Sequence, residues 1–139
     1  MPEEIFDIIR KRYVVLTPEE KVRQHIVSVL INEKEIPQSL ISIEAQIKVG
    51  KLIKRYDILV YDRNLKPWML IECKRENIKI TPEVLNQTIR YNQTIDSSYL
   101  LITNGIEYYC FKKDVAKNNL THQETFPAFP PKINPKDSL

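Results

Sequence analysis

The middle of the chain consists of two short apolar segments separated by a polar turn. Residues 55–62 and 68–74 are rich in Ile, Leu, Val, Tyr and Trp, and the residues between them include Asn64 and Pro67, which favour turns. The pattern therefore predicts a β-hairpin. If its loop is centred between residues 64 and 65, the numbers of each facing pair sum to 129. The facing pairs are then Tyr61 with Trp68, Leu59 with Leu70, and Asp57 with Glu72.

The hydrophobic pattern on either side of this hairpin predicts two helices and three further strands. Thr17, Pro18 and Glu20 form a helix start, in which Thr17 is the N-cap and Glu20 completes a capping box. Thr81 and Pro82 open a second helix in the same way. The expected elements are a helix from residue 17 with an apolar face at residues 22, 26, 29 and 30, a strand over 41–49, a helix from 81 to about 96, and strands over 98–102 and 106–111 joined by Thr103-Asn104-Gly105. The order helix, strand, strand, strand, helix, strand, strand is that of an α/β domain.

The length and composition are those of one globular domain. The chain has 139 residues, 42% of them hydrophobic and 28% charged. We expect a single domain over residues 1–124 and an extended, mobile tail over 125–139, which holds four of the nine prolines. No apolar run approaches the roughly 20 residues that a membrane helix needs, and the first residues do not resemble a signal peptide. The two isolated cysteines, Cys73 and Cys110, favour a reducing, cytoplasmic location.

Asp57, Glu72 and Lys74 are the residues with the clearest chemistry. Because strand side chains alternate with period two, the proposed register places all three on one face of the sheet. Facing carboxylates would have Cβ atoms roughly 4.5–5.5 Å apart and would repel one another unless a positive charge lay between them. A divalent cation such as Mg²⁺, for which Mn²⁺ can substitute, has the preference for oxygen ligands that such a pair would satisfy.

Two further features fit a polyanionic substrate, although each also has a purely structural explanation. Residues 48–79 hold nine basic residues against four acidic ones, among them Lys54 and Arg55, and this excess would attract phosphates or simply form a solvated surface. Gln87 and Tyr91 are four residues apart on the second helix, so their polar groups share one face. That face could contact substrate or simply face solvent.

Together these residues resemble the PD-(D/E)xK nucleases, with Asp57, Glu72 and Lys74 at the signature positions and Tyr56 where the motif often has Pro. The spacing of Gln87 and Tyr91 resembles the Q-x-x-x-Y motif of one branch of that superfamily. Within it, the segments around Thr17–Gln24, Arg55–Asp57, Ile71–Lys74, Asn86–Asn92 and Thr103–Gly105 are similar to the N-terminal nuclease domain of type I restriction enzyme R subunits, in a stand-alone form.

The resemblance implies an αβββαβ core with a mixed central sheet flanked by helices, and a set of roles for individual residues. Asp57 and Glu72 would hold Mg²⁺ with help from the backbone carbonyl of Cys73, Lys74 would assist the attacking water, and the substrate would contact Gln87, Tyr91, Arg55 and Lys54. It also gives Glu20 a second explanation beside capping, because many relatives carry a metal-binding acid on the first helix.

The function implied is metal-dependent hydrolysis of phosphodiester bonds, with DNA as the expected substrate. The alternative is a nuclease-fold module that binds nucleic acid or a helicase-like partner without cutting. The partners to consider are nucleic acid, a helicase-like or restriction-modification subunit and a second copy of the chain, but not a membrane. The sequence contains no G-x-x-x-x-G-K-[ST] motif for an ATP-driven motor.

Overall fold

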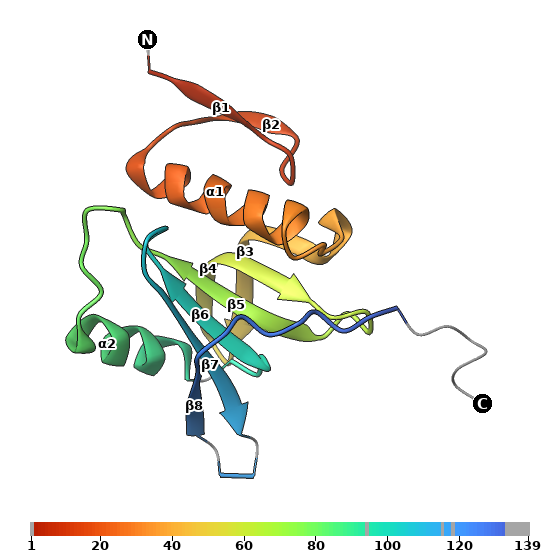
Figure 1. The fold of residues 1–139 in the computed structure, drawn as a ribbon, viewed down its shortest axis with the longest axis vertical. Coiled ribbons are helices and arrows are strands. Elements are labelled where there is room, and N and C mark those ends of the chain that lie inside the picture. The colour runs from red at the N-terminus through yellow and green to blue at the C-terminus, as the bar shows by residue number, and fades with distance from the viewer. Residues whose placement is uncertain (1, 94, 115, 118, 133–139) are drawn as a thin grey trace.

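The fold is a six-stranded mixed sheet with one helix on each face (Figure 1). It was analysed in a computed structural model that describes residues 2–93, 95–114, 116, 117 and 119–132. The elements are β1 (Glu4–Asp7), β2 (Arg12–Val15), α1 (Pro18–Asn32), the 3₁₀ helix η1 (Gln38–Leu40), β3 (Ile41–Val49), β4 (Leu52–Tyr61), β5 (Pro67–Cys73), α2 (Pro82–Asn92), β6 (Tyr99–Thr103), β7 (Tyr108–Asp114) and β8 (Asn119–Gln123). No helix among the described residues is long and apolar enough to cross a membrane.

The sheet has the strand order β3-β4-β5-β6-β7-β8. Only the neighbours β5 and β6 are parallel, and they are connected through α2; the remaining pairs are antiparallel. The expected order helix, strand, strand, strand, helix, strand, strand is confirmed by α1 to β7. Three strands were not expected: β8 at the sheet edge, and the separate β1–β2 hairpin, which lies beside α1 in Figure 1. The strands β1 and β2 have only four residues each, and β8 is mostly polar, so none of them shows a clear apolar pattern.

The two faces of the sheet carry separate apolar cores. On the α1 side, Ile26 and Leu30 belong to the same cluster as Ile58 and Met69, all nearly inaccessible to solvent. On the opposite side, α2 contributes Val84, Leu85 and Ile89 to a cluster that includes Leu59, Leu70 and Ile102. Burial on both faces explains why the central strands are almost continuously apolar.

The helix starts agree with the sequence, but one helix end does not. Thr17 accepts a hydrogen bond from the Glu20 backbone N–H at 3.1 Å, and Thr81 accepts one from Val84 at 3.3 Å. The second helix was expected to reach about residue 96, yet α2 ends at Asn92. The Ile95 backbone N–H donates to the Asn92 carbonyl, and Ile95 is buried, so the chain turns there to bring an apolar side chain into the core.

The central hairpin has the expected register over most of its length. Leu59 faces Leu70, as expected, but Tyr61 faces Pro67 and not Trp68. The difference arises at the turn, where Leu65 has a left-handed φ of 61° and the Asp62 carboxylate accepts hydrogen bonds from the backbone of Asn64 and Lys66. This compact turn shifts the register between Val60 and Tyr61.

Strict alternation of side chains fails beside the expected site. Tyr56 and Leu59 pack in the same cluster under α2, although strict alternation would place residues three apart on opposite faces. The neighbouring strand changes face at the same level, because Ile43 packs on the α1 side and Ala45 on the α2 side. Glu44, between them, has a left-handed φ of 54°, which re-aims the chain.

The segment after residue 124 is partly packed. Its described part, up to residue 132, has no helix or strand, as expected. However, Phe126 and Phe129 pack edge-on against Trp68, with ring centroids 6.3 and 5.0 Å away. These residues therefore cover the α1-side core instead of extending freely into solvent. The rest of the expected tail, residues 133–139, lies outside the described residues.

Candidate active site

Asp57 lies where β4 and β5 separate. The ladder between these strands has Ile58 opposite Ile71 as its last pair on this side. One step further, Oδ2 of Asp57 accepts a hydrogen bond from the Cys73 backbone N–H at 2.8 Å. A side-chain bond thus replaces ladder pairing and fixes the position of the Asp57 carboxylate. The expected metal-binding role of Cys73 concerned its carbonyl; here its N–H orients the carboxylate.

Glu72 is a half-buried residue beside Asp57, and its Oε1 is buried. Burial, then the charge of Asp57 and a hydrogen bond with that carboxyl group, raise the pKa of Glu72 to about 8, against the lowering effect of Lys74 and Arg23. The neutral form of Glu72 is therefore favoured more strongly than that of an ordinary glutamate side chain. Among the described residues, its buried Oε1 has no hydrogen-bond partner. Asp57 and Glu72 are not a facing pair of the ladder, as the proposed register had them, but Asp57 and Lys74 both lie near enough to Glu72 to influence its charge.

Lys74 follows β5 at a point held by the turn between β6 and β7. Its backbone N–H donates to the Thr103 carbonyl at 2.7 Å. Asn104, almost fully buried, uses its amide N–H to bind the Ile78 carbonyl at 2.9 Å, and its Oδ1 accepts from the backbone of Ile106 and Glu107. The Thr103-Asn104-Gly105 segment therefore fixes the loop that starts at Lys74.

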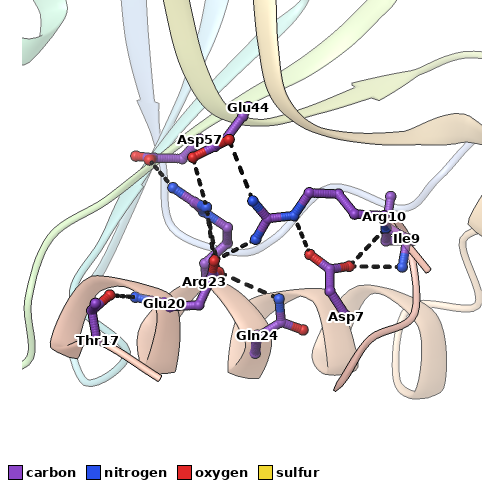
Figure 2. A network of polar contacts seen from close by, with 9 residues as sticks. All are labelled: Asp7, Ile9, Arg10, Thr17, Glu20, Arg23, Gln24, Glu44 and Asp57. Atoms are coloured by element: carbon purple, nitrogen blue, oxygen red, sulfur yellow. Dashed lines mark hydrogen bonds and ion pairs between the residues drawn. The ribbon is translucent and has the colours of Figure 1, made fainter. Parts of the chain in front are cut away.

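Asp57 belongs to a network of two arginines and four carboxylates (Figure 2). Arg23 of α1 donates from Nη2 to Oδ1 of Asp57 at 3.1 Å, and from Nη1 to Glu20 at 3.2 Å and Glu44 at 3.5 Å. Arg10, in the turn of the β1–β2 hairpin, binds Asp7, Glu20 and Glu44. Burial acts to raise the pKa of Asp7, but hydrogen bonds from the backbone and side chain of Arg10 and from Ile9 lower it overall.

The second half of the expected capping box is absent. The Thr17 backbone N–H donates to Val15, and the buried Glu20 carboxylate instead binds Arg10, Arg23 and Gln24. Two guanidinium groups attract this carboxylate more strongly than one peptide N–H would. Glu20 does face the site, as the metal-binding explanation required, but arginines surround it.

Gln87 and Tyr91 are exposed on one face of α2, as their spacing predicted. The Tyr91 ring contacts Nζ of Lys54, which lies 4.8 Å from the ring centroid and donates to the Tyr91 carbonyl at 2.6 Å. Burial, then the charges of Tyr91 and Glu72, raise the pKa of Tyr56 to about 12. Tyr91 of α2 and Glu72 of β5 are therefore both near enough to Tyr56 to affect the pKa of its phenol. Arg55 is exposed on β4.

Sequence reasoning missed Arg10, Arg23, Glu44 and Asn104. Arg23 carried a usable signal, because it precedes Ile26, Val27 and Leu30 by three, four and seven residues and so lies on the apolar face of its helix. A charge on such a face needs a buried partner. Arg10 and Glu44 gave no comparable signal, because their contacts depend on the β1–β2 hairpin and on the left-handed backbone of Glu44.

Comparisons with known proteins identify one family and one similar solved structure. Residues 18–127 match the family model described as the N terminus of the type I restriction enzyme R protein. No curated protein matches the chain. Among solved structures, the type IIG restriction endonuclease BpuSI is similar over 71% of this chain, with 19% sequence identity and a TM-score of 0.48. The similar region makes up 12% of the length of that endonuclease.

Proposed function

The chain belongs to the family of type I restriction enzyme R protein N termini, and we propose that it is a metal-dependent nuclease that hydrolyses phosphodiester bonds of DNA. The observation that carries this proposal is the grouping of two carboxyl groups and a lysine where β4 and β5 separate. Oε1 of Glu72 is buried and has no hydrogen-bond partner among the described residues, an arrangement that costs stability in a purely structural site. Such a cost is commonly found at functional sites.

The donor set fits a small, hard cation. Asp57 and Glu72 would hold Mg²⁺, or Mn²⁺ in its place, since Mg²⁺ usually takes one or two protein carboxylates and fills its shell with water and substrate phosphate. Within the described part of the chain, no group of three or more His, Cys, Asp or Glu side chains is arranged to hold a metal. The proposal is therefore a two-carboxylate site, which the Cys73 carbonyl would supplement. When bound, the metal would polarise the scissile phosphate and activate water.

Cys73 and Lys74 would have separate roles in the reaction. The Cys73 N–H holds Asp57 in a fixed orientation through a neutral hydrogen bond. Lys74, whose backbone is anchored to Thr103, supplies a positive charge beside Glu72, where it would orient water and stabilise the charge that develops on the phosphate.

The substrate would lie along the β3–β4 hairpin and the exposed face of α2. Residues 45–56 contain four basic residues and no acidic residue. Leu52 and Ile53 are both about two-thirds exposed, so neither face of this end of the hairpin is covered by the rest of the protein. Lys54 joins the hairpin to Tyr91, Gln87 is exposed one turn before Tyr91 on α2, and Arg55 is exposed next to Lys54 on β4. A positive surface with exposed apolar and aromatic groups suits nucleic acid, which offers both phosphates and base faces.

A cleavage assay tests the proposal directly. Purified protein is incubated with single-stranded, duplex and branched DNA in Mg²⁺, in Mn²⁺ or in EDTA. We expect cleavage that requires metal and that Asp57→Asn abolishes. Lys66→Ala, which removes an exposed turn lysine, should cut normally and serves as the matched control for Lys74→Ala. Equal cleavage by wild type and Asp57→Asn would assign the activity to a contaminant.

A module that binds without cutting is the second candidate, and the ion pair between Arg23 and Asp57 favours it, because a guanidinium already neutralises the proposed metal ligand. Such a module would bind DNA or a helicase-like subunit with the same affinity in metal and in EDTA. Binding that is indifferent to metal, together with no cleavage of any substrate, would support this function over the nuclease.

A further inference from the structure

The contacts of Arg23 suggest a role that the proposed nuclease function does not include. Its side chain is 11% exposed and lies between three acidic residues from three different elements. Of these, only Asp57 belongs to the proposed metal site. Arg23 and a metal ion would therefore both interact with the Asp57 carboxylate.

Both oxygens of Asp57 already have partners, but the two bonds differ in kind. Oδ2 accepts from the neutral Cys73 N–H, and this bond is compatible with a metal on the remaining lone pairs. Oδ1 accepts from the Arg23 guanidinium, which carries a full positive charge. A divalent cation on Asp57 would lie close to that charge and be repelled by it. The metal and Arg23 therefore cannot both be bound strongly by this carboxylate.

Arg23 has alternative partners within reach. Its Nη1 already contacts Glu20 and Glu44, so releasing Asp57 would leave its charge paired. The Glu44 side chain is 40% exposed and can adjust to the moving guanidinium. Arg10 also binds Oε1 of Glu20 and Oε2 of Glu44, so both acids keep a second cationic partner when Arg23 moves (Figure 2).

We propose that Arg23 is a resident counter-ion of the metal site: it neutralises Asp57 in the metal-free protein and is displaced toward Glu20 and Glu44 when a metal ion binds. Glu20 is then a positioning residue for Arg23 and not a metal ligand. The inference rests on the proposed function, because it assumes that Asp57 binds metal. It predicts that Arg23 lowers metal affinity while keeping the metal-free protein intact.

Titration calorimetry with Mn²⁺ on the full chain, at fixed pH and ionic strength, tests the inference through binding and not through activity. Arg23→Gln keeps a donor but removes the charge, and we expect Mn²⁺ to bind on the order of tenfold more tightly. Glu44→Gln removes an alternative partner for Arg23, so Mn²⁺ should bind several-fold more weakly. The exposed pair Arg75 and Glu19, 3.7 Å apart, provides matched controls. Arg75→Gln and Glu19→Gln should change affinity by less than about twofold, because solvent and salt screen their charges.

The outcomes separate the inference from the proposed function. Weaker or unchanged Mn²⁺ binding by Arg23→Gln, with normal binding by wild type, would overturn the counter-ion role and leave the metal site standing. No Mn²⁺ binding by wild type would overturn both. If Arg23→Gln does not fold without metal, Glu44→Gln decides alone, since it leaves the contact between Arg23 and Asp57 in place. Unchanged affinity in that variant would refute the inference.

Discussion

Replacing Glu72 with Gln should stabilise the metal-free protein at alkaline pH. The pKa of Glu72 is about 8 in the folded protein, mainly through burial and then through Asp57, against an ordinary value of 4.5. The folded state therefore binds the Glu72 proton more tightly than the unfolded state does. The stabilisation due to this proton is fully present below pH 4.5 and is lost as the pH rises through 8. Gln carries no ionisable proton, so the variant avoids this loss.

The magnitude follows from the size of the shift. Each pKa unit corresponds to about 1.4 kcal/mol, so a rise from 4.5 to about 8 amounts to a few kcal/mol, on the order of a third of the stability of a typical domain. The Gln amide can still donate to Asp57, so the variant should resemble the protonated wild type. The difference in unfolding free energy between variant and wild type should grow from pH 5.5 to about pH 8 and level off above it.

Urea denaturation in EDTA, monitored by Trp68 fluorescence at pH values from 5.5 to 8.5, measures this difference. Glu76→Gln is the matched control, because Glu76 is exposed and contacts Lys21 only at 3.9 Å. Its difference from wild type should stay within about 0.5 kcal/mol at every pH. A flat difference for Glu72→Gln over the same range would mean that Glu72 titrates normally. The description of Glu72 as a partner of Asp57 with a raised pKa would then be wrong.

Three other predictions concern chemistry, substrate binding and folding. Lys74→Ala should lower the cleavage rate about 10²–10³-fold while DNA affinity, measured by fluorescence anisotropy, stays close to that of wild type; a parallel loss of affinity would make Lys74 a binding residue. DNA affinity should fall steeply as salt rises, and Lys54→Ala with Arg55→Ala should flatten the plot of log affinity against log salt by roughly two units in slope; an unchanged slope would move the binding surface elsewhere. Phe129→Ala should lower the unfolding free energy by about 1–3 kcal/mol because the ring packs edge-on against Trp68, and no loss of stability would show that the segment after residue 124 does not contribute to the core.

The sequence by itself determined most of the fold. Alternating and continuous apolar segments, two Thr-Pro helix starts and an Asn-Gly turn gave the element order, because these signals depend on neighbours within a few residues. The same local signals predicted the hairpin that brings Asp57 near Glu72, since the register of a hairpin follows from its turn, but they did not predict the change of face in β4 or the end of the ladder before Asp57. The left-handed backbone of Leu65 was not predicted, and the predicted pairing of Tyr61 with Trp68 was wrong for that reason, since Tyr61 faces Pro67.

The tertiary structure alone decided how the site is neutralised. Arg10, Arg23, Glu20 and Glu44 come from a hairpin, a helix and a strand that are distant in sequence, and their charges meet only after packing. The role of Glu20 shows the physical reason. Its spacing from Thr17 predicted a local capping bond, but a buried carboxylate is stabilised more by two guanidinium groups than by one peptide N–H, so the long-range partners determine its conformation.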